Sequence, residues 1–103
     1  HAEAARVAVN LADGLVNAAE AQYTAGRLML RAKQPQRALH FLRRAVAIDA
    51  SKIEYQLSLA QAQFMLGRAQ DSIATLEAIL ARHPDDERAQ YWLAETRRAM
   101  ESR

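Results

Sequence analysis

Apolar and small residues recur along the chain with the spacing of amphipathic helices, and short polar turns separate the segments that carry them. Turn residues stand at Asp13-Gly14, Pro35, Gly67 and His83-Pro84, where proline suits the start of a helix and glycine suits its end. No segment favours a strand, so we expect an all-α chain of about six helices. Their predicted ranges are about 2–12, 18–32, 35–48, 52–66, 69–82 and 86–101.

The pattern repeats with a period of 34 residues. Sliding the sequence by that length aligns Asn17, Ser51 and Asp85, which are all favourable helix N-caps. Glu20 and Glu54 follow the first two caps by three positions, as in a capping box. Repeats of this length are typical of helix hairpins that stack and share one core.

Small and large side chains also recur at this period, which is a packing pattern rather than a chemical one. Gly26 aligns with Ala60, and Leu42 aligns with Leu76. Leucine at Gly26 or Ala60 is predicted to destabilise the fold by about 1–3 kcal/mol. Gly26→Ala is predicted to be mild, since glycine inside a helix is about 1 kcal/mol less favourable than alanine. We expect buried side chains at Ala25, Gly26, Ala38, Leu39, Leu42, Leu59, Ala60, Ile73, Leu76, Leu93 and Ala94.

These residues resemble the tetratricopeptide repeat family, whose pattern is W-x2-L-G-x2-Y, then A-x3-F, then a terminal proline. The segment 53–86 fits best, with Leu59-Ala60 at the Leu-Gly pair, Gly67 at the turn between helices and Pro84 at the terminal proline. Glutamine stands at the family's tryptophan position in each repeat, at Gln22, Gln56 and Gln90.

The resemblance implies a right-handed solenoid of antiparallel helix hairpins, forming one domain over residues 1–103. Within it, residues 2–14 would be the second helix of a preceding repeat. Residues 18–52 would be repeat 1, residues 53–86 repeat 2, and residues 87–101 the first helix of a third repeat or a cap. The chain would then be part of a larger protein, whose missing neighbours leave ends that could self-associate.

The resemblance also implies a concave groove, lined by the first helix of each repeat, that binds a peptide or a partner protein. The alternatives are a solvated helix face with Leu57, Phe64 and Met65 in the core, or an interface on the outer helices around Arg43 and Arg44. The groove candidates are Glu20, Tyr23, Arg27, Glu54, Leu57, Gln61, Arg88, Tyr91, Trp92 and Glu95, with Leu30, Phe64, Met65 and Arg98 beside them.

Tyr23, Leu57 and Tyr91 fall at equivalent positions and are predicted to form a stripe along the groove. Tyrosine offers contact area and a hydroxyl, so Tyr23→Ala and Tyr91→Ala are predicted to weaken partner binding by about 1–2 kcal/mol without changing stability. Charges of both signs flank the stripe, which predicts a partner of mixed charge.

Some family members bind a C-terminal carboxylate with a clamp of lysine, asparagine and arginine. The residues at the corresponding positions here are Tyr23, Arg27, Gln61, Arg88 and Trp92, so this mode is not expected.

The remaining chemistry is sparse. The chain has no cysteine, which excludes disulfides and thiolate sites, and His1, His40 and His83 lack the spacing of metal ligands. Asp85-Asp86-Glu87 is better explained as a helix start than as a calcium site. No phosphate loop or nucleophile motif occurs, so we expect no enzyme, no cofactor and no small-molecule substrate.

The formal charge is +2 with acids and bases interleaved, which disfavours nucleic-acid binding, and no apolar run could span a membrane. The leading hypothesis is a protein–protein interaction scaffold, and the alternatives are a spacer or self-association module and a nucleic-acid binder. The Ala-, Arg- and Gln-rich repeats are similar in style to those of bacterial envelope proteins that assist pilus, polysaccharide or secretion machinery. This style suggests the periplasm, with the cytoplasm as the alternative.

Overall fold

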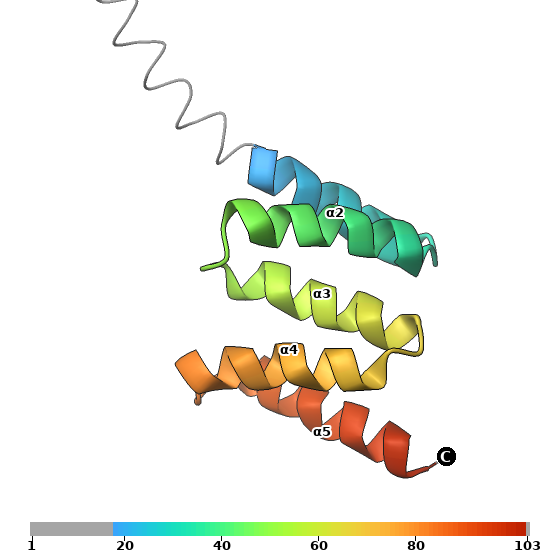
Figure 1. Cartoon of the computed structure of the whole chain (residues 1–103), viewed down its shortest axis with the longest axis vertical. Helices are drawn as coiled ribbons and strands as arrows, with labels where there is room; N and C mark the ends of the chain where they lie inside the picture. Colours follow the sequence, from blue (N-terminus) through green and yellow to red (C-terminus); the bar gives the residue numbers. More distant parts are fainter. Residues whose placement is uncertain (1–17, 103) are drawn as a thin grey trace, which may run out of the picture.

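The computed structural model describes residues 18–102, which form five helices joined by short turns and contain no strand (Figure 1). The first predicted helix, over 2–12, lies outside the described residues. The other five lie close to the predicted ranges. They are the helix over 18–31, α2 (Pro35–Ile48), α3 (Ile53–Met65), α4 (Ala69–Arg82) and α5 (Glu87–Glu101).

The helices stack one after another, and consecutive helices run in opposite directions (Figure 1). α3 packs against α2 and α4, and α4 packs against α5. α3 also contacts α5, its equivalent one repeat later. The predicted all-α architecture of antiparallel hairpins is therefore confirmed. The helix over 18–31, α3 and α5 are named the first helices below, and α2 and α4 the second helices.

Close packing occurs at the predicted small positions. Gly26 is buried against Leu42, whose side chain is wholly inaccessible to solvent. One repeat later, Ala60 packs in a core cluster with Leu76. The hydroxyl of buried Ser72 donates a hydrogen bond of 2.8 Å to the carbonyl of Ala60. Small residues thus let a second helix approach the backbone of a first helix.

Burial is confirmed for most of the predicted core. Ala25, Leu59 and Ile73 are half-buried, and the prediction for Ala94 is wrong because its side chain is exposed. Ala94 is the equivalent of Gly26 and Ala60, which are covered by the next second helix. No helix follows α5 among the described residues, so Ala94 has no such cover.

Two of the predicted N-caps are also wrong. α3 has Lys52 at its N-cap with no side-chain cap bond, so the Ser51–Glu54 capping box does not form. Instead, the hydroxyl and backbone N–H of Ser51 both donate to a carboxylate oxygen of Asp49, and these bonds lower the Asp49 pKa. The third prediction, Asn17, lies outside the described residues.

The N-cap of α5 is Asp86 rather than Asp85. Its carboxylate accepts a hydrogen bond of 2.9 Å from the backbone N–H of Ala89, and this bond is the main reason that the pKa of Asp86 is lowered. The sequence offered two adjacent aspartates, and only the geometry of the preceding turn decides between them.

The turn between the helices of each hairpin has the same geometry in both repeats. Gly67 has φ +79°, as predicted for a glycine after a helix end, and Lys33 lies 34 residues earlier with φ 61°. The backbone N–H that follows each of them donates to the carbonyl five residues back, Arg68 to Gln63 and Gln34 to Met29. Lys33 therefore occupies a left-handed position that favours glycine.

Exchanging these two residue types should have opposite effects. Lys33→Gly is expected to stabilise the protein by about 0.5–1 kcal/mol, since a side chain in the left-handed region is strained. Gly67→Ala is the matched control and should destabilise by about 1 kcal/mol. No atom lies within 4 Å of the Cβ that Gly67→Ala adds, so the expected loss of stability comes from backbone strain and not from a steric clash. Urea denaturation measures both changes, and a destabilising Lys33→Gly would contradict the shared turn geometry.

Candidate functional site

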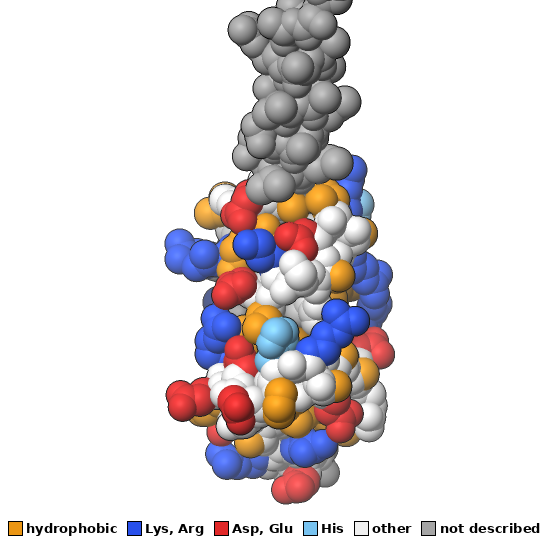
Figure 2. Space-filling model, turned by 90° about the vertical axis from the view of Figure 1, so that its left-hand side faces the viewer, with side chains coloured by type: hydrophobic (Ala, Val, Ile, Leu, Met, Phe, Trp, Pro, Cys, Tyr) orange, Lys and Arg blue, Asp and Glu red, His pale blue; other side chains and the backbone are white. Residues whose placement is uncertain are grey.

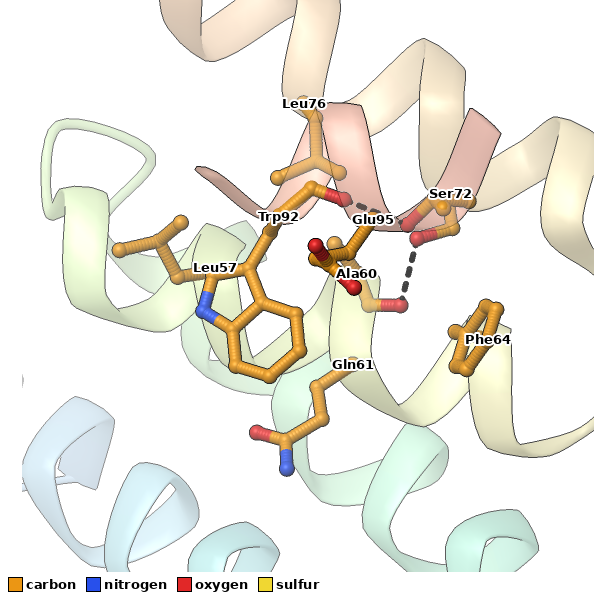
Figure 3. A pocket seen from close by; sticks show the side chains of 9 residues that line it. Leu57, Ala60, Gln61, Phe64, Ser72, Leu76, Trp92 and Glu95 are labelled. Carbon is orange, nitrogen blue, oxygen red and sulfur yellow. Dashed lines mark hydrogen bonds between the residues drawn. The ribbon is translucent and has the colours of Figure 1, made fainter. Parts of the chain in front are cut away.

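An open hollow lies between α3 and α5, with α4 behind it. Trp92 of α5 and Phe64 of α3 stand at its two sides, and Gln61 lies at its edge (Figure 3). It is named the apolar hollow below, and its lining consists of Leu57, Ala60, Gln61, Phe64, Ser72, Leu76, Trp92, Glu95 and Thr96.

The apolar hollow leaves large aromatic surface accessible to solvent. Trp92 is 43% exposed and Phe64 is 39% exposed, while Leu57 is half-buried against the core cluster around Leu76. The hydroxyl of Thr96 donates to the carbonyl of Trp92 at 2.7 Å, within α5. The alternative interpretation required Phe64 to be a core residue, and its exposure contradicts this. Exposed aromatics around a hollow can bury an apolar side chain of a ligand.

A second open hollow lies between the helix over 18–31 and α3. It is named the basic hollow because it is lined by Arg27, Leu30, Arg31, Ser58 and Gln61. Leu30 is buried beneath it, whereas both arginines are exposed. Gln61 lines both hollows, so they adjoin along α3. Together they are named the groove below.

The predicted stripe of Tyr23, Leu57 and Tyr91 differs in exposure along its length. Tyr91 is 58% exposed, Leu57 lines the apolar hollow, and Tyr23 is half-buried. The ring of Tyr23 lies 4.7 Å from that of Tyr55, measured between centroids. Tyr23 packs against two core clusters, so its removal should reduce stability, contrary to the prediction from sequence. Tyr91 is open because no described helix follows α5.

Most of the predicted charged candidates are paired within the protein. Arg88 reaches across from α5 to Glu54 of α3, with 3.6 Å between nitrogen and oxygen, and also pairs with Asp86 at 3.2 Å. The hydrogen bond to Asp86 is the main cause of the raised pKa of Arg88. Glu95 pairs with Arg98 at 2.7 Å.

Glu20 has a different kind of partner. Its carboxylate accepts a hydrogen bond of 2.9 Å from the hydroxyl of Tyr55, which is buried. Arg27 lies over the ring of Tyr23, with 5.5 Å from the guanidinium carbon to the ring centroid. Within residues 18–102, neither Arg27 nor Arg31 forms an ion pair.

The α2 face is the main competing surface. His40, Arg43 and Arg44 line a shallow hollow, and α2 carries no acidic residue. By contrast, the face at the helix ends mixes charges of both signs (Figure 2). In the part of the chain that the structure describes, no group of three acidic or histidine side chains could hold a metal ion. None of the described helices is long and apolar enough to cross a membrane.

Sequence reasoning missed several of these contacts. Arg31 and Ser58 were not among the candidates, although Arg31 lies one helical turn from Arg27 and could have been found from that spacing. Two of the three glutamines at the family's tryptophan position also have a definite contact. Gln56 donates to the carbonyl of Ala50, and Gln90 donates to that of Pro84, both at 2.6 Å. Each glutamine thereby fastens the loop that precedes its helix.

Comparison with known proteins identifies one family. A family model described as a tetratricopeptide repeat matches residues 29–96, which is more than half of the chain. The match runs from the end of the helix over 18–31 into α5 and includes both hairpin turns. Among curated proteins, no match is found.

Proposed function

Because the chain belongs to the tetratricopeptide repeat family, we propose that it is a scaffold whose groove binds a peptide or a partner protein. Repeats of this family generally mediate protein–protein interaction. The observation that carries the proposal is the apolar hollow, where Trp92 and Phe64 remain accessible. Binding energy at protein interfaces concentrates on such aromatic anchors in pockets.

The other proposals from sequence rest on different surfaces. Self-association through the end of the stack would use the α5 face, where Tyr91 and Ala94 are exposed. Nucleic-acid binding would use Arg43 and Arg44 on α2, where phosphate contacts would weaken steeply with salt. A bacterial envelope setting remains a proposal from the composition of the repeats. The groove is favoured because it combines a hollow with exposed aromatic surface.

Trp92→Ala is the direct test of the proposal. A partner captured by the immobilised protein, at low and at high salt, would be identified and titrated by calorimetry. Trp92→Ala is expected to weaken its binding by about 2 kcal/mol, since truncating a central aromatic anchor typically has such an effect. Ile48→Ala is the matched control, because Ile48 is 40% exposed but lies at the end of α2, away from the groove.

The outcome also separates the competing surfaces. Normal binding by Trp92→Ala, together with loss of binding by Arg43→Gln and Arg44→Gln, would place the interface on α2 and refute the groove. Sedimentation of the unliganded protein over a range of concentrations tests the third surface, because association through α5 would depend on Tyr91.

A further inference from the structure

The groove has two chemically distinct halves. The apolar hollow presents Leu57, Phe64 and Trp92, and the basic hollow presents two guanidinium groups and a hydroxyl. Gln61 lines both of them. A single extended segment in the groove would therefore meet an apolar surface and a cationic surface next to each other.

The acidic residues that the sequence predicted for the groove already have partners within the protein. Glu54 pairs with Arg88, Glu95 pairs with Arg98, and Glu20 accepts from Tyr55. Glu54 and Glu95 are therefore less available to a cationic partner than unpaired carboxylates would be, and Glu20, which keeps its charge beside a neutral hydroxyl, lines neither hollow.

The positive charges of the basic hollow have no such compensation. Arg27 and Arg31 are one helical turn apart, where like charges repel, and no described carboxylate pairs with either. The segment 18–48 has one acidic residue, Glu20. Its basic residues are Arg27, Arg31, Lys33, Arg37, Arg43 and Arg44. An anionic group between the two guanidinium groups would relieve their repulsion and accept several hydrogen bonds.

We propose that the groove binds an acidic protein segment, in which one carboxylate side chain enters the basic hollow and a neighbouring bulky apolar side chain enters the apolar hollow. The carboxylate accepts hydrogen bonds from Arg27 and Arg31, with Ser58 and Gln61 as further donors. The apolar side chain packs between Phe64 and Trp92. This inference rests on the proposed function and specifies the chemistry of the partner.

A nucleic acid fits the same groove less well. Its bases could stack on Trp92, but its backbone carries a phosphate at every nucleotide, whereas the described arginines that line the groove are confined to the basic hollow. A polypeptide can place one carboxylate beside one apolar side chain and keep the rest of the segment neutral.

Short synthetic peptides provide the test. The probes are acetylated and amidated Gly-Ser peptides that carry one glutamate and one phenylalanine at varied separations. Matched peptides replace the glutamate by glutamine or lysine, or the phenylalanine by alanine, and a single-stranded oligothymidine serves as the nucleic-acid probe. Trp92 is the only tryptophan of the chain, so its fluorescence reports on the apolar hollow.

We expect Glu-Phe peptides of at least one separation to change the fluorescence of Trp92. The glutamine and alanine peptides should bind about fivefold or more weakly, and the lysine peptide should not bind. Arg27→Gln and Arg31→Gln should each reproduce the loss seen with the glutamine peptide, and added salt should weaken binding. Arg37→Gln, which removes a charge outside the groove, should leave binding unchanged.

Equal binding of the glutamate, glutamine and lysine peptides at Trp92 would overturn the acidic-partner inference and leave the groove as a binding site. Tighter binding of oligothymidine than of any peptide, with loss in Arg27→Gln, would assign the basic hollow to nucleic acid. Failure of every probe to perturb Trp92 would overturn the inference. The proposed function would then be judged separately by the effect of Trp92→Ala on the captured partner.

Discussion

Gly26→Ala is expected to lower the free energy of unfolding by about 2 kcal/mol, as overpacking of a tight core does. An added Cβ would lie 2.6 Å from both Cγ and Cδ2 of Leu42, closer than carbon atoms can approach. Leu42 is fully buried, so it cannot move aside without disturbing its neighbours. The sequence alone predicted a mild effect, but this contact outweighs the gain of about 1 kcal/mol in helix propensity.

A double-mutant cycle by chemical denaturation tests the cause. Leu42→Ala alone should destabilise the protein by about 3 kcal/mol, because it leaves a cavity in the core. In that background Gly26→Ala should become neutral or stabilising, since the clash is gone and the propensity gain remains. If Gly26→Ala destabilises both backgrounds equally, the contact with Leu42 is not the reason for glycine at this position.

Tyr55→Ala is expected to destabilise the protein by about 3–4 kcal/mol, the usual range for removing a buried aromatic side chain. Tyr55 is 2% exposed and packs in one core cluster with Ala19 and Ala45. Because Ala19 lies in the helix over 18–31 and Ala45 in α2, the side chain joins α3 to the preceding hairpin. Tyr55→Phe keeps this packing and loses only the bond to Glu20, so about 1 kcal/mol is expected.

The hydroxyl of Tyr55 should also make stability depend on alkaline pH. Burial first, and then the hydrogen bond to Glu20, raise the pKa of Tyr55 from 10.0 to about 12. The unfolded protein therefore releases this proton at lower pH than the folded protein does. Its contribution to stability is complete below about pH 10 and is lost as the pH rises towards 12. Tyr55→Phe should lack this component of the alkaline loss, and an unchanged pH dependence in that variant would contradict the raised pKa.

The repeat period allowed much of the fold to be predicted. Pro35 begins α2, Gly67 adopts the left-handed conformation, and Leu42 and Leu76 are buried, all as the pattern indicated. Such features depend on local backbone preferences and on periodic burial, which one sequence records directly. The left-handed Lys33 could have been found the same way, because it aligns with Gly67.

The failures concern residues whose environment depends on more than the period. Tyr55 aligns with Ala21 and Ala89, so the repeat gave no sign that an aromatic side chain fills this part of the core. Ala94 aligns with Ala60, but only a following helix would cover it. Ser51 aligns with favourable caps, but its hydroxyl donates to Asp49 and does not cap α3.

For the groove too, the sequence predicted some features correctly and missed others. Leu57, Gln61, Trp92 and Glu95 were predicted from the family resemblance and line the apolar hollow. The sequence could not show which charges of the groove are paired, because Glu54 and Arg88 lie on different helices and are 34 residues apart in the chain. Together with the pair of Glu95 and Arg98, this pairing leaves Arg27 and Arg31 as the charged groove residues without an ionic partner in 18–102.

The stacking of neighbours has a consequence for how the chain reaches its native state. Contacts between α2, α3, α4 and α5 join helices that are adjacent in the sequence or one helix further apart. Among these helices no distant segments must meet, so little loop-closure entropy opposes their first productive encounter, and topologies of this kind fold rapidly. Each hairpin can serve as a nucleus onto which the next helix adds, and the ends of the stack can open while its middle stays folded.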